Sequence, residues 1–357
     1  MERSEDPPTA QAAAEAEGGG AAGAASKVRF RAGERVLTLV ATPLNYMVLR
    51  ALAERPMRLA ELRQATGLSA QTTLRGHLAN LSEIGVLNKR PTSQMPYAVE
   101  NELTELGHDL LDVTDRLEWW LGQSPKGPIS LETGAAKGVV KAFVDGWGST
   151  MMGDLADRPM SLTELDRRIA DLSYPALERR LSSMRLAGLI ESRPGAGTGI
   201  PYTMTEWARR GIVPLAAATR CERVYLCDRA APVTQGDIEA AFMLALPLVG
   251  LPPDVAGSCQ LEVEADSVVS EQAGVRVEIE HGRVVACDSG LAPSPAAFAA
   301  GSASMWFTAI RDGTASLLST GGGQLAEGLV TGLHSALAER PCSERATSSP
   351  RKGTSTS

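Results

Sequence analysis

Residues 52–87 read LAERPMRLAELRQATGLSAQTTLRGHLANLSEIGVL, and residues 155–190 read LADRPMSLTELDRRIADLSYPALERRLSSMRLAGLI. The two stretches align without a gap at an offset of 103 residues, and eleven of the 36 positions are identical. A period of about 100 residues indicates a duplicated domain, because solenoid units repeat every ~20 to 50 residues. The sequence therefore predicts two successive domains of the same kind.

Each copy has the same predicted order of elements. A first helix (43–54 and 138–156) ends before Arg-Pro, since proline disfavours the helical conformation in the residue that precedes it. A short helix follows (58–65 and 161–169). A third helix carries apolar residues at i, i+4 and i+7, namely Leu74, Leu78 and Leu81 in one copy and Leu177, Leu181 and Met184 in the other.

Glycine and proline mark how each copy ends. Gly85 and Gly188 suit the left-handed conformation that closes a helix. An apolar pair, a polar tip and then Pro-Tyr follow each glycine, at Pro96-Tyr97 and Pro201-Tyr202, which predicts a hairpin. Three helices and a hairpin make a winged helix.

The stretch RPMRLAELRQATGLSAQTTLRGHLANLSEIGVL and its partner resemble bacterial winged helix-turn-helix regulators of the HxlR and MarR families, over about residues 36–230. The resemblance implies a transcription regulator that binds double-stranded DNA, with the third helix in the major groove and the wing along the backbone. Gln, Arg and Thr can read base edges, and Lys and Arg neutralise phosphates. The DNA-binding residues expected on these grounds are Gln71, Thr72, Thr73, Arg75, His77, Lys89 and Arg90 in copy one, and Tyr174, Arg179, Arg180 and Arg193 in copy two.

Two alternatives to DNA binding stay open. Winged helices also serve as protein-interaction modules, and the same polar side chains could form solvated faces. Copy two has Pro175 and Glu178 on its third helix, which change its face. We therefore expect DNA binding by at least one copy.

Charge separates the chain into blocks. The net charge is −7, with 35 basic and 42 acidic residues. Basic residues outnumber acidic ones by 12 to 11 in 27–122 and by 15 to 12 in 123–231, whereas 232–341 holds 4 basic and 13 acidic residues. Because phosphate affinity depends on the local field, the two central blocks remain candidates for DNA and the third does not.

A heptad pattern lies between the copies. Leu103, Leu106, Leu110, Val113, Leu117 and Trp120 form an apolar seam on an expected helix, 102–121. The seam could join the two copies within one chain, join two chains in a homodimer, or pack on its own domain.

The third block changes to a two-residue period. Val275, Val277 and Ile279 predict a half-buried strand, and His281-Gly282 predicts a tight turn into a strand over 283–287. Helices are expected at 295–300 and 302–312, a strand at 315–319, a bend at the three glycines 321–323, and a helix with Leu325, Leu329, Leu333 and Leu337. This order describes an α+β domain.

The run from Val275 to Leu337 resembles the sterol carrier protein type domain, over about residues 235–340. The resemblance implies a tunnel for an apolar small molecule, with Phe298, Trp306, Phe307 and Leu329 as wall residues. These residues could equally form a filled core. A lipid carrier and a protein-interaction scaffold are thus the alternatives to a ligand-responsive regulator.

The predicted architecture is multidomain and mainly α with α+β: a disordered arm (1–26), two tandem winged helices (27–122 and 123–231), a sterol-carrier-like domain (232–341) and a disordered tail (342–357). The five cysteines lack metal-ligand spacing, and we expect reduced, idle thiols, with a redox pair of Cys221 and Cys227 as the alternative. No catalytic constellation is found among four histidines, so neither an enzyme nor a metal or cofactor is expected. With no signal peptide or apolar span found, we expect a cytoplasmic protein without a membrane partner.

Overall fold

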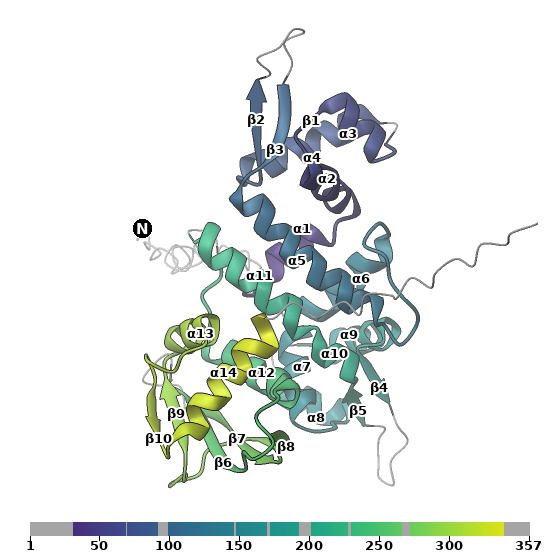
Figure 1. The fold of residues 1–357 in the computed structure, drawn as a ribbon. Coiled ribbons are helices and arrows are strands. Elements are labelled where there is room, and N and C mark those ends of the chain that lie inside the picture. Colours follow the sequence, from purple (N-terminus) through teal and green to yellow (C-terminus); the bar gives the residue numbers. More distant parts are fainter. Residues whose placement is uncertain are drawn as a thin grey trace, which may run out of the picture.

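The computed structural model describes residues 31–68, 70–91, 99–145, 148–169, 172–192, 201–227, 230–265 and 272–338 (Figure 1). The first repeat, α1 to α5, contains a helix-turn-helix and a three-stranded sheet of order β1-β3-β2. Its elements are α1 (Glu34–Val40), α2 (Pro43–Glu54), β1 (Met57–Arg58), α3 (Leu59–Ala65), α4 (Gln71–Glu83), β2 (Leu87–Pro91), β3 (Val99–Leu103) and α5 (Glu105–Gly122).

The second repeat, α6 to α11, follows a similar order, with an isolated bridge at Met160 in place of β1 and two helices in place of α5. Its elements are α6 (Gly134–Val144), α7 (Gly148–Asp157), α8 (Leu162–Arg168), α9 (Tyr174–Ala187), β4 (Ile190–Ser192), β5 (Tyr202–Met204), α10 (Glu206–Arg210) and α11 (Ile212–Tyr225). Gly85 (φ 81°) and Gly188 (φ 83°) both have the left-handed conformation expected after α4 and α9. Leu74, Leu78 and Leu81 are buried, as are Leu177, Leu181 and Met184.

The helix expected at 138–156 is wrong, because the chain holds two helices there. Asp145, which follows α6, has an extended ψ of 124°, and α7 begins at Gly148. The Asp145-Gly146 pair is a turn signal that the helical period obscured. The equivalent of α6 in the first repeat is α1, a helix that the sequence reasoning missed.

The hairpins also correct the expected alignment of the two copies. Met57 pairs with Asn101 in the first repeat, and Met160 pairs with Tyr202 in the second. Tyr202 therefore occupies the place of Asn101. The offset between equivalent residues of the two repeats is 103 before the wing and 101 after it, because the wing of the second repeat is two residues shorter. Pro96 and Tyr97 lie outside the described residues.

The seam of α5 is buried within the same chain. Helix α11 packs along α5, with α1 and α2 beside them. The indole Nε1 of Trp120 donates to the carbonyl of Trp207 and that of Trp207 to the carbonyl of Trp120, both at 2.7 Å. The rings stack 4.8 Å apart. The structure thus realises the in-chain alternative, and a homodimer through helix 102–121 would need the same buried side chains.

Helix α1 is held on α11 by a buried carboxylate. Glu222, 1% exposed, accepts hydrogen bonds from the backbone N–H groups of Gly33 (3.0 Å) and Val36 (2.9 Å). Burial raises the pKa of Glu222, and these N–H groups oppose that rise. Since the first N–H groups of a helix have no partner inside it, Glu222 caps α1 from another element.

The C-terminal region is α+β, with a mixed five-stranded sheet of order β10-β9-β6-β7-β8. Its elements are α12 (Gln235–Ala245), the 3-10 helix η1 (Leu246–Leu248), β6 (Gly257–Val263), β7 (Ala273–Glu280), β8 (Arg283–Ser289), β9 (Phe298–Gly301), α13 (Ala303–Asp312), β10 (Ser319–Gly321) and α14 (Gln324–Ala338). His281 (φ 52°) and Gly282 (φ 73°) form the turn expected between β7 and β8.

Three expectations for this region need correction. The helix expected at 295–300 is wrong, because β9 pairs in parallel with β6 and antiparallel with β10 there. Its Ala-rich sequence favours a helix, but pairing with two strands overrides local propensity. The strand expected at 315–319 is shifted to β10, Ser319–Gly321, and β6 and α12 were missed.

The expected bend at the glycines is present. Gly322 has φ 80°, and a Cβ there would lie 2.2 Å from the carbonyl oxygen of Ala296. Only glycine fits such an approach.

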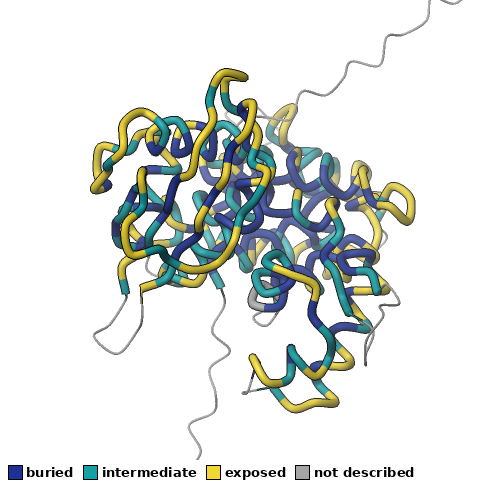
Figure 2. The backbone as a smooth tube through the Cα atoms, turned by 90° about the horizontal axis from the view of Figure 1, so that it is seen from below, coloured by how far each residue is buried: buried dark blue, intermediate teal, exposed yellow. Residues whose placement is uncertain are grey.

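The C-terminal region packs directly on the second repeat and on α5. Helix α12 lies against α7, and α14 lies against α11 (Figure 1). Arg116 of α5, 4% exposed, donates to the carbonyl oxygen of Ala338 at the end of α14 (2.7 Å). Buried positions are concentrated in the middle of the molecule, and exposed positions gather at its periphery (Figure 2).

No single helix in the described ranges is both long and apolar enough to cross a membrane. The pair α1 and α2, bent by 77°, has the length and composition to do so together.

Candidate nucleic-acid interface

Helix α4 is the candidate reading helix of the first repeat. Its buried leucine stripe faces α2 and α3, which leaves the opposite side to solvent. Gln71, Thr72, Thr73 and Arg75 are all exposed at its N-terminal half. A helix with short polar side chains and one arginine at this end can enter a DNA groove and contact base edges.

His77 lies differently from the other candidates on α4. Its ring is half-buried, and Nδ1 lies 2.8 Å from Oδ1 of Asn45 in α2. Asn45 is buried and donates to the carbonyl oxygen of Leu39 (3.0 Å). The imidazole thus joins α4 to the helix behind it.

The wing places two basic side chains beside α4. Lys89 and Arg90 are exposed on β2, and Arg90 lies 3.6 Å from Glu102 on the neighbouring strand. An exposed ion pair of this length is weak, so a phosphate can compete for the guanidinium. The wing tip, 92–98, lies outside the described residues.

The equivalent surface of the second repeat has different chemistry. Glu178 stands where the first repeat has Arg75, and Glu191 stands where it has Asn88. Arg180 forms an ion pair with Asp145 (2.8 Å), and Nε of Arg179 donates to the carbonyl oxygen of Pro175 (3.3 Å). Tyr174 is 48% exposed. Arg193 lies outside the described residues.

Sequence reasoning missed the residues that position both surfaces. Oγ1 of Thr104 contacts the carbonyl oxygens of Gly85 (2.7 Å) and Val86 (3.1 Å), and Oγ1 of Thr205 contacts those of Gly188 (3.0 Å) and Leu189 (3.1 Å). Each threonine ties the end of the third helix to the strand and helix that follow. A Thr-Glu pair at 104–105 and 205–206 was the signal.

A second shared contact involves residues that were identical in the alignment. Arg55 pairs with Glu61 (2.8 Å), and Arg158 pairs with Glu164 (3.0 Å). Glu61 and Glu164 also accept from the backbone N–H of Arg58 and Ser161, at 2.7 Å in each case. These hydrogen bonds lower the pKa of both carboxyls, that of Glu164 to about 2.

The four residues expected to line a ligand tunnel are not together. Trp306 and Leu329 are fully buried in the core, and Trp306 donates to the carbonyl oxygen of Glu262 (2.7 Å). Phe298 is half-buried, with its ring over Gly321. Phe307 lines a pocket between the C-terminal region and the second repeat.

Three described cysteines, Cys221, Cys259 and Cys287, form no disulfide and have low thiol reactivity. Burial raises the pKa of Cys221, Cys259 and Cys287 to about 12 in each case. A thiol in that state rarely forms the reactive thiolate, which weighs against the redox pair of Cys221 with the exposed Cys227. Among the described residues, no group of three or more His, Cys, Asp and Glu side chains could hold a metal ion.

A comparison with known protein families found a match in the first repeat. Residues 39–126, which span the end of α1 through α5, match the model of the HxlR-like helix-turn-helix family. A comparison with curated proteins found no significant match.

Proposed function

Because residues 39–126 match the HxlR-like helix-turn-helix family, we propose that this chain is a DNA-binding transcription regulator. The observation that carries the proposal is the exposed polar face of α4 in that matched segment, with Lys89 and Arg90 on the adjacent wing. The C-terminal region, with its acidic excess, takes no part in binding DNA.

The first repeat reads DNA in this proposal. Gln71, Thr72, Thr73 and Arg75 face base edges in the major groove, and Lys89 and Arg90 neutralise phosphates. His77 acts as a positioning residue, because its hydrogen bond to Asn45 orients α4 on α2.

The second repeat is a second winged helix whose outer surface is less suited to binding DNA. The acidic Glu178 and Glu191 replace Arg75 and Asn88 on its outer surface, and Asp145 neutralises Arg180. Its role is to cover the seam of α5 through α11, where a second subunit would otherwise be needed. The chain then resembles a dimer built from one polypeptide.

Fluorescence anisotropy with DNA from the region upstream of the chain's own coding sequence tests this proposal. Binding should be tight at about 50 mM salt and fall steeply toward about 200 mM, because phosphate contacts release counterions. Arg75→Ala should weaken binding about tenfold or more, since an arginine-to-guanine contact contributes about 1–3 kcal/mol.

Arg179→Ala is the matched control, because Arg179 is an exposed arginine on the equivalent helix of the second repeat. The affinity of the Arg179→Ala variant for DNA should stay within about twofold of that of the wild type. An equal loss in both variants would overturn the assignment of reading to the first repeat. Absence of binding at low salt would overturn the proposed function and favour a protein-interaction scaffold.

A further inference from the structure

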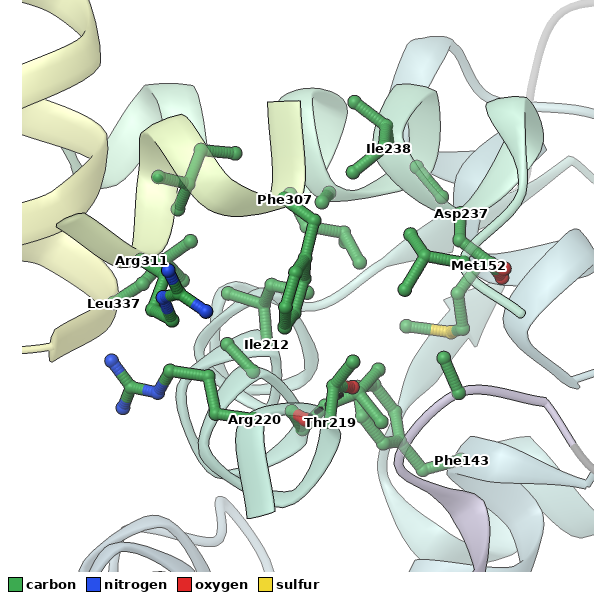
Figure 3. Close-up of a pocket in the computed structure, with 18 residues that line it drawn as sticks. Phe143, Met152, Ile212, Thr219, Arg220, Asp237, Ile238, Phe307, Arg311 and Leu337 are labelled. Carbon is green, nitrogen blue, oxygen red and sulfur yellow. Dashed lines mark hydrogen bonds between the residues drawn. The ribbon is translucent and has the colours of Figure 1, made fainter. Parts of the chain in front are cut away.

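A pocket lies where the C-terminal region meets the second repeat (Figure 3). Helix α11 forms one wall, and α12 and α13 form the other. The volume of the cavity is about 100 Å³. This volume limits the occupant to a slender chain or a single ring.

Apolar side chains make up most of the pocket wall. Phe307 lies in the middle of the pocket in Figure 3. Ile212 lies below it, and Met152 and Phe143 lie to the right. Small residues of α12, Ala240 and Ala241, leave the space open. Such a wall favours an apolar ligand body, because removing apolar surface from water is favourable.

Charged groups lie at the two ends of the pocket. Arg220 and Arg311 share one end in Figure 3, and Asp237 lies at the other. Asp237 is already engaged: Oδ2 accepts from the backbone N–H of Thr234 (2.9 Å), and Oδ1 lies 3.6 Å from Arg31. Because both oxygens of Asp237 have partners in the protein, this end of the pocket does not favour a cationic ligand.

Arg220 is in the opposite situation. It is half-buried, and within the described part of the chain no hydrogen bond or ion pair reaches its guanidinium. Burial lowers its pKa, as does the nearby Arg116, while Asp112 and Asp109 act in the other direction from farther away than an ion pair. A half-buried guanidinium is partly desolvated, and an anion in the pocket would supply the acceptor that the described side chains do not.

Arg311 can assist at the same end. It pairs with its neighbour Asp312 (2.7 and 2.9 Å), and both side chains are 42% exposed. An exposed pair of this kind contributes little to stability, so its guanidinium can turn to a ligand at little cost.

We propose that this pocket binds a small organic acid, with its carboxylate at Arg220 and its apolar body against Phe307 and Ile212. The ligand would touch the second repeat and the C-terminal region at once, so its occupancy would stiffen their contact. The site is independent of DNA binding, and only its regulatory effect rests on the proposed function.

The regulatory effect would pass through two contacts. Leu337 of α14 lines the pocket, and Arg116 of α5 binds the carbonyl oxygen of the next residue, Ala338. Helix α5 begins at the wing, where Thr104 holds it to the end of α4. A ligand that favours one arrangement of α11 and α14 would then bias the wing of the reading domain.

Isothermal titration calorimetry of the full chain with sodium octanoate tests the site, with 1-octanol as the neutral analogue of the same length. Octanoate should bind saturably below about 1 mM, and octanol at least tenfold more weakly, since the alcohol cannot form the charge-assisted hydrogen bond to Arg220. Arg220→Gln should lower octanoate affinity at least tenfold and leave that of octanol unchanged. Ala241→Leu should weaken both ligands by filling the space.

Arg223→Gln is the matched control, an exposed arginine on the same helix that does not line the pocket. It should bind octanoate like the wild type, and circular dichroism should show all variants folded. Should Ala241→Leu fail to fold, the comparison of Arg220→Gln with Arg223→Gln carries the test. Equal affinity for octanoate and octanol, full octanoate binding by Arg220→Gln, or no binding at all would overturn the site.

Octanoate added to the anisotropy assay tests the regulatory effect separately. The Kd for DNA should shift in the wild type and stay constant in Arg220→Gln. An unchanged Kd in a wild-type protein that binds both octanoate and DNA would overturn the coupling, while the calorimetry would still support the site.

Discussion

Thr104 and Thr205 make the same contacts in the two repeats, between the end of the third helix and the start of the helix after the wing. Each hydroxyl contacts two carbonyl oxygens at the end of the third helix, and each accepts from the N–H three residues on, at 3.2 Å from Gly107 and 3.1 Å from Ala208. One side chain thereby closes one helix and starts another. The joint fixes the angle between the candidate reading helix and α5, or between their equivalents.

We expect Thr104→Val and Thr205→Val to destabilise the protein by similar amounts, about 0.5–2 kcal/mol each, because both remove an N-cap and keep the shape. Urea unfolding followed by circular dichroism measures the loss. Thr163→Val, at an exposed position of α8, is the control. A loss confined to one site would contradict the structural equivalence of the two repeats.

Among elements, the contact between α7 and α12 holds an unusual concentration of acid. Asp154 and Asp157 of α7 face Glu239 of α12, with Arg168 of α8 as a basic partner 2.5 Å from Asp154. Burial raises the pKa of Glu239, Arg168 lowers it, and Asp154 and Asp157 raise it further. Burial also raises the pKa of Asp154, against its hydrogen bond from Arg168.

A raised pKa means that the folded state holds the Glu239 proton more tightly than the unfolded state does. Protonated Glu239 therefore contributes its full stabilising free energy below pH about 4.5, the pKa of this carboxyl in the unfolded state. That contribution is lost as the pH rises through the higher pKa of the folded state. Glu239→Gln should raise Tm by a few degrees at pH 8 and leave it unchanged at pH 4. Differential scanning calorimetry at both pH values measures this.

Glu327→Gln, on an exposed part of α14, is the control for the charge change and should shift Tm little at either pH. Equal effects of Glu239→Gln at pH 4 and pH 8 would show that ionisation of Glu239 is not the source of the change.

Across the whole molecule, α5 connects parts that are far apart in the sequence. It follows the wing of the first repeat, packs on α11 of the second, and reaches α14 through Arg116. Arg116 also pairs with Asp112 (2.8 Å), and its side chain is 5% exposed. Helix α14 is thus held by a residue more than 200 positions earlier in the chain.

Arg116→Met should destabilise the protein by about 1–3 kcal/mol, since it leaves the terminal carbonyls of α14 without their donor. Hydrogen exchange should quicken most in the last turn of α14. Arg63→Met, exposed on α3, should change neither quantity. Uniformly faster exchange throughout the chain would mean that Arg116 supports global stability and not this contact.

Much of the two repeats could be read from local patterns. Leucine spacing and Gly85 or Gly188 predicted α4 and α9, and the alternation around Val277 predicted β7 with its turn at His281. These features depend on residues close in sequence, where backbone preference and burial period act together. The same local reading failed at 295–300, because two strand partners from other parts of the chain decide the conformation of β9.

The sequence by itself determined the repeat, the helix ends and the polar character of the α4 face, because each follows from neighbouring residues. Only the tertiary structure decided that α11 covers the seam of α5, that Asn45 engages His77, and that Asp145 neutralises Arg180. It also decided that Phe307 and Arg220 meet in one pocket while Trp306 fills a core. The physical reason is that packing partners are chosen by the free energy of long-range contacts, which a local period does not encode.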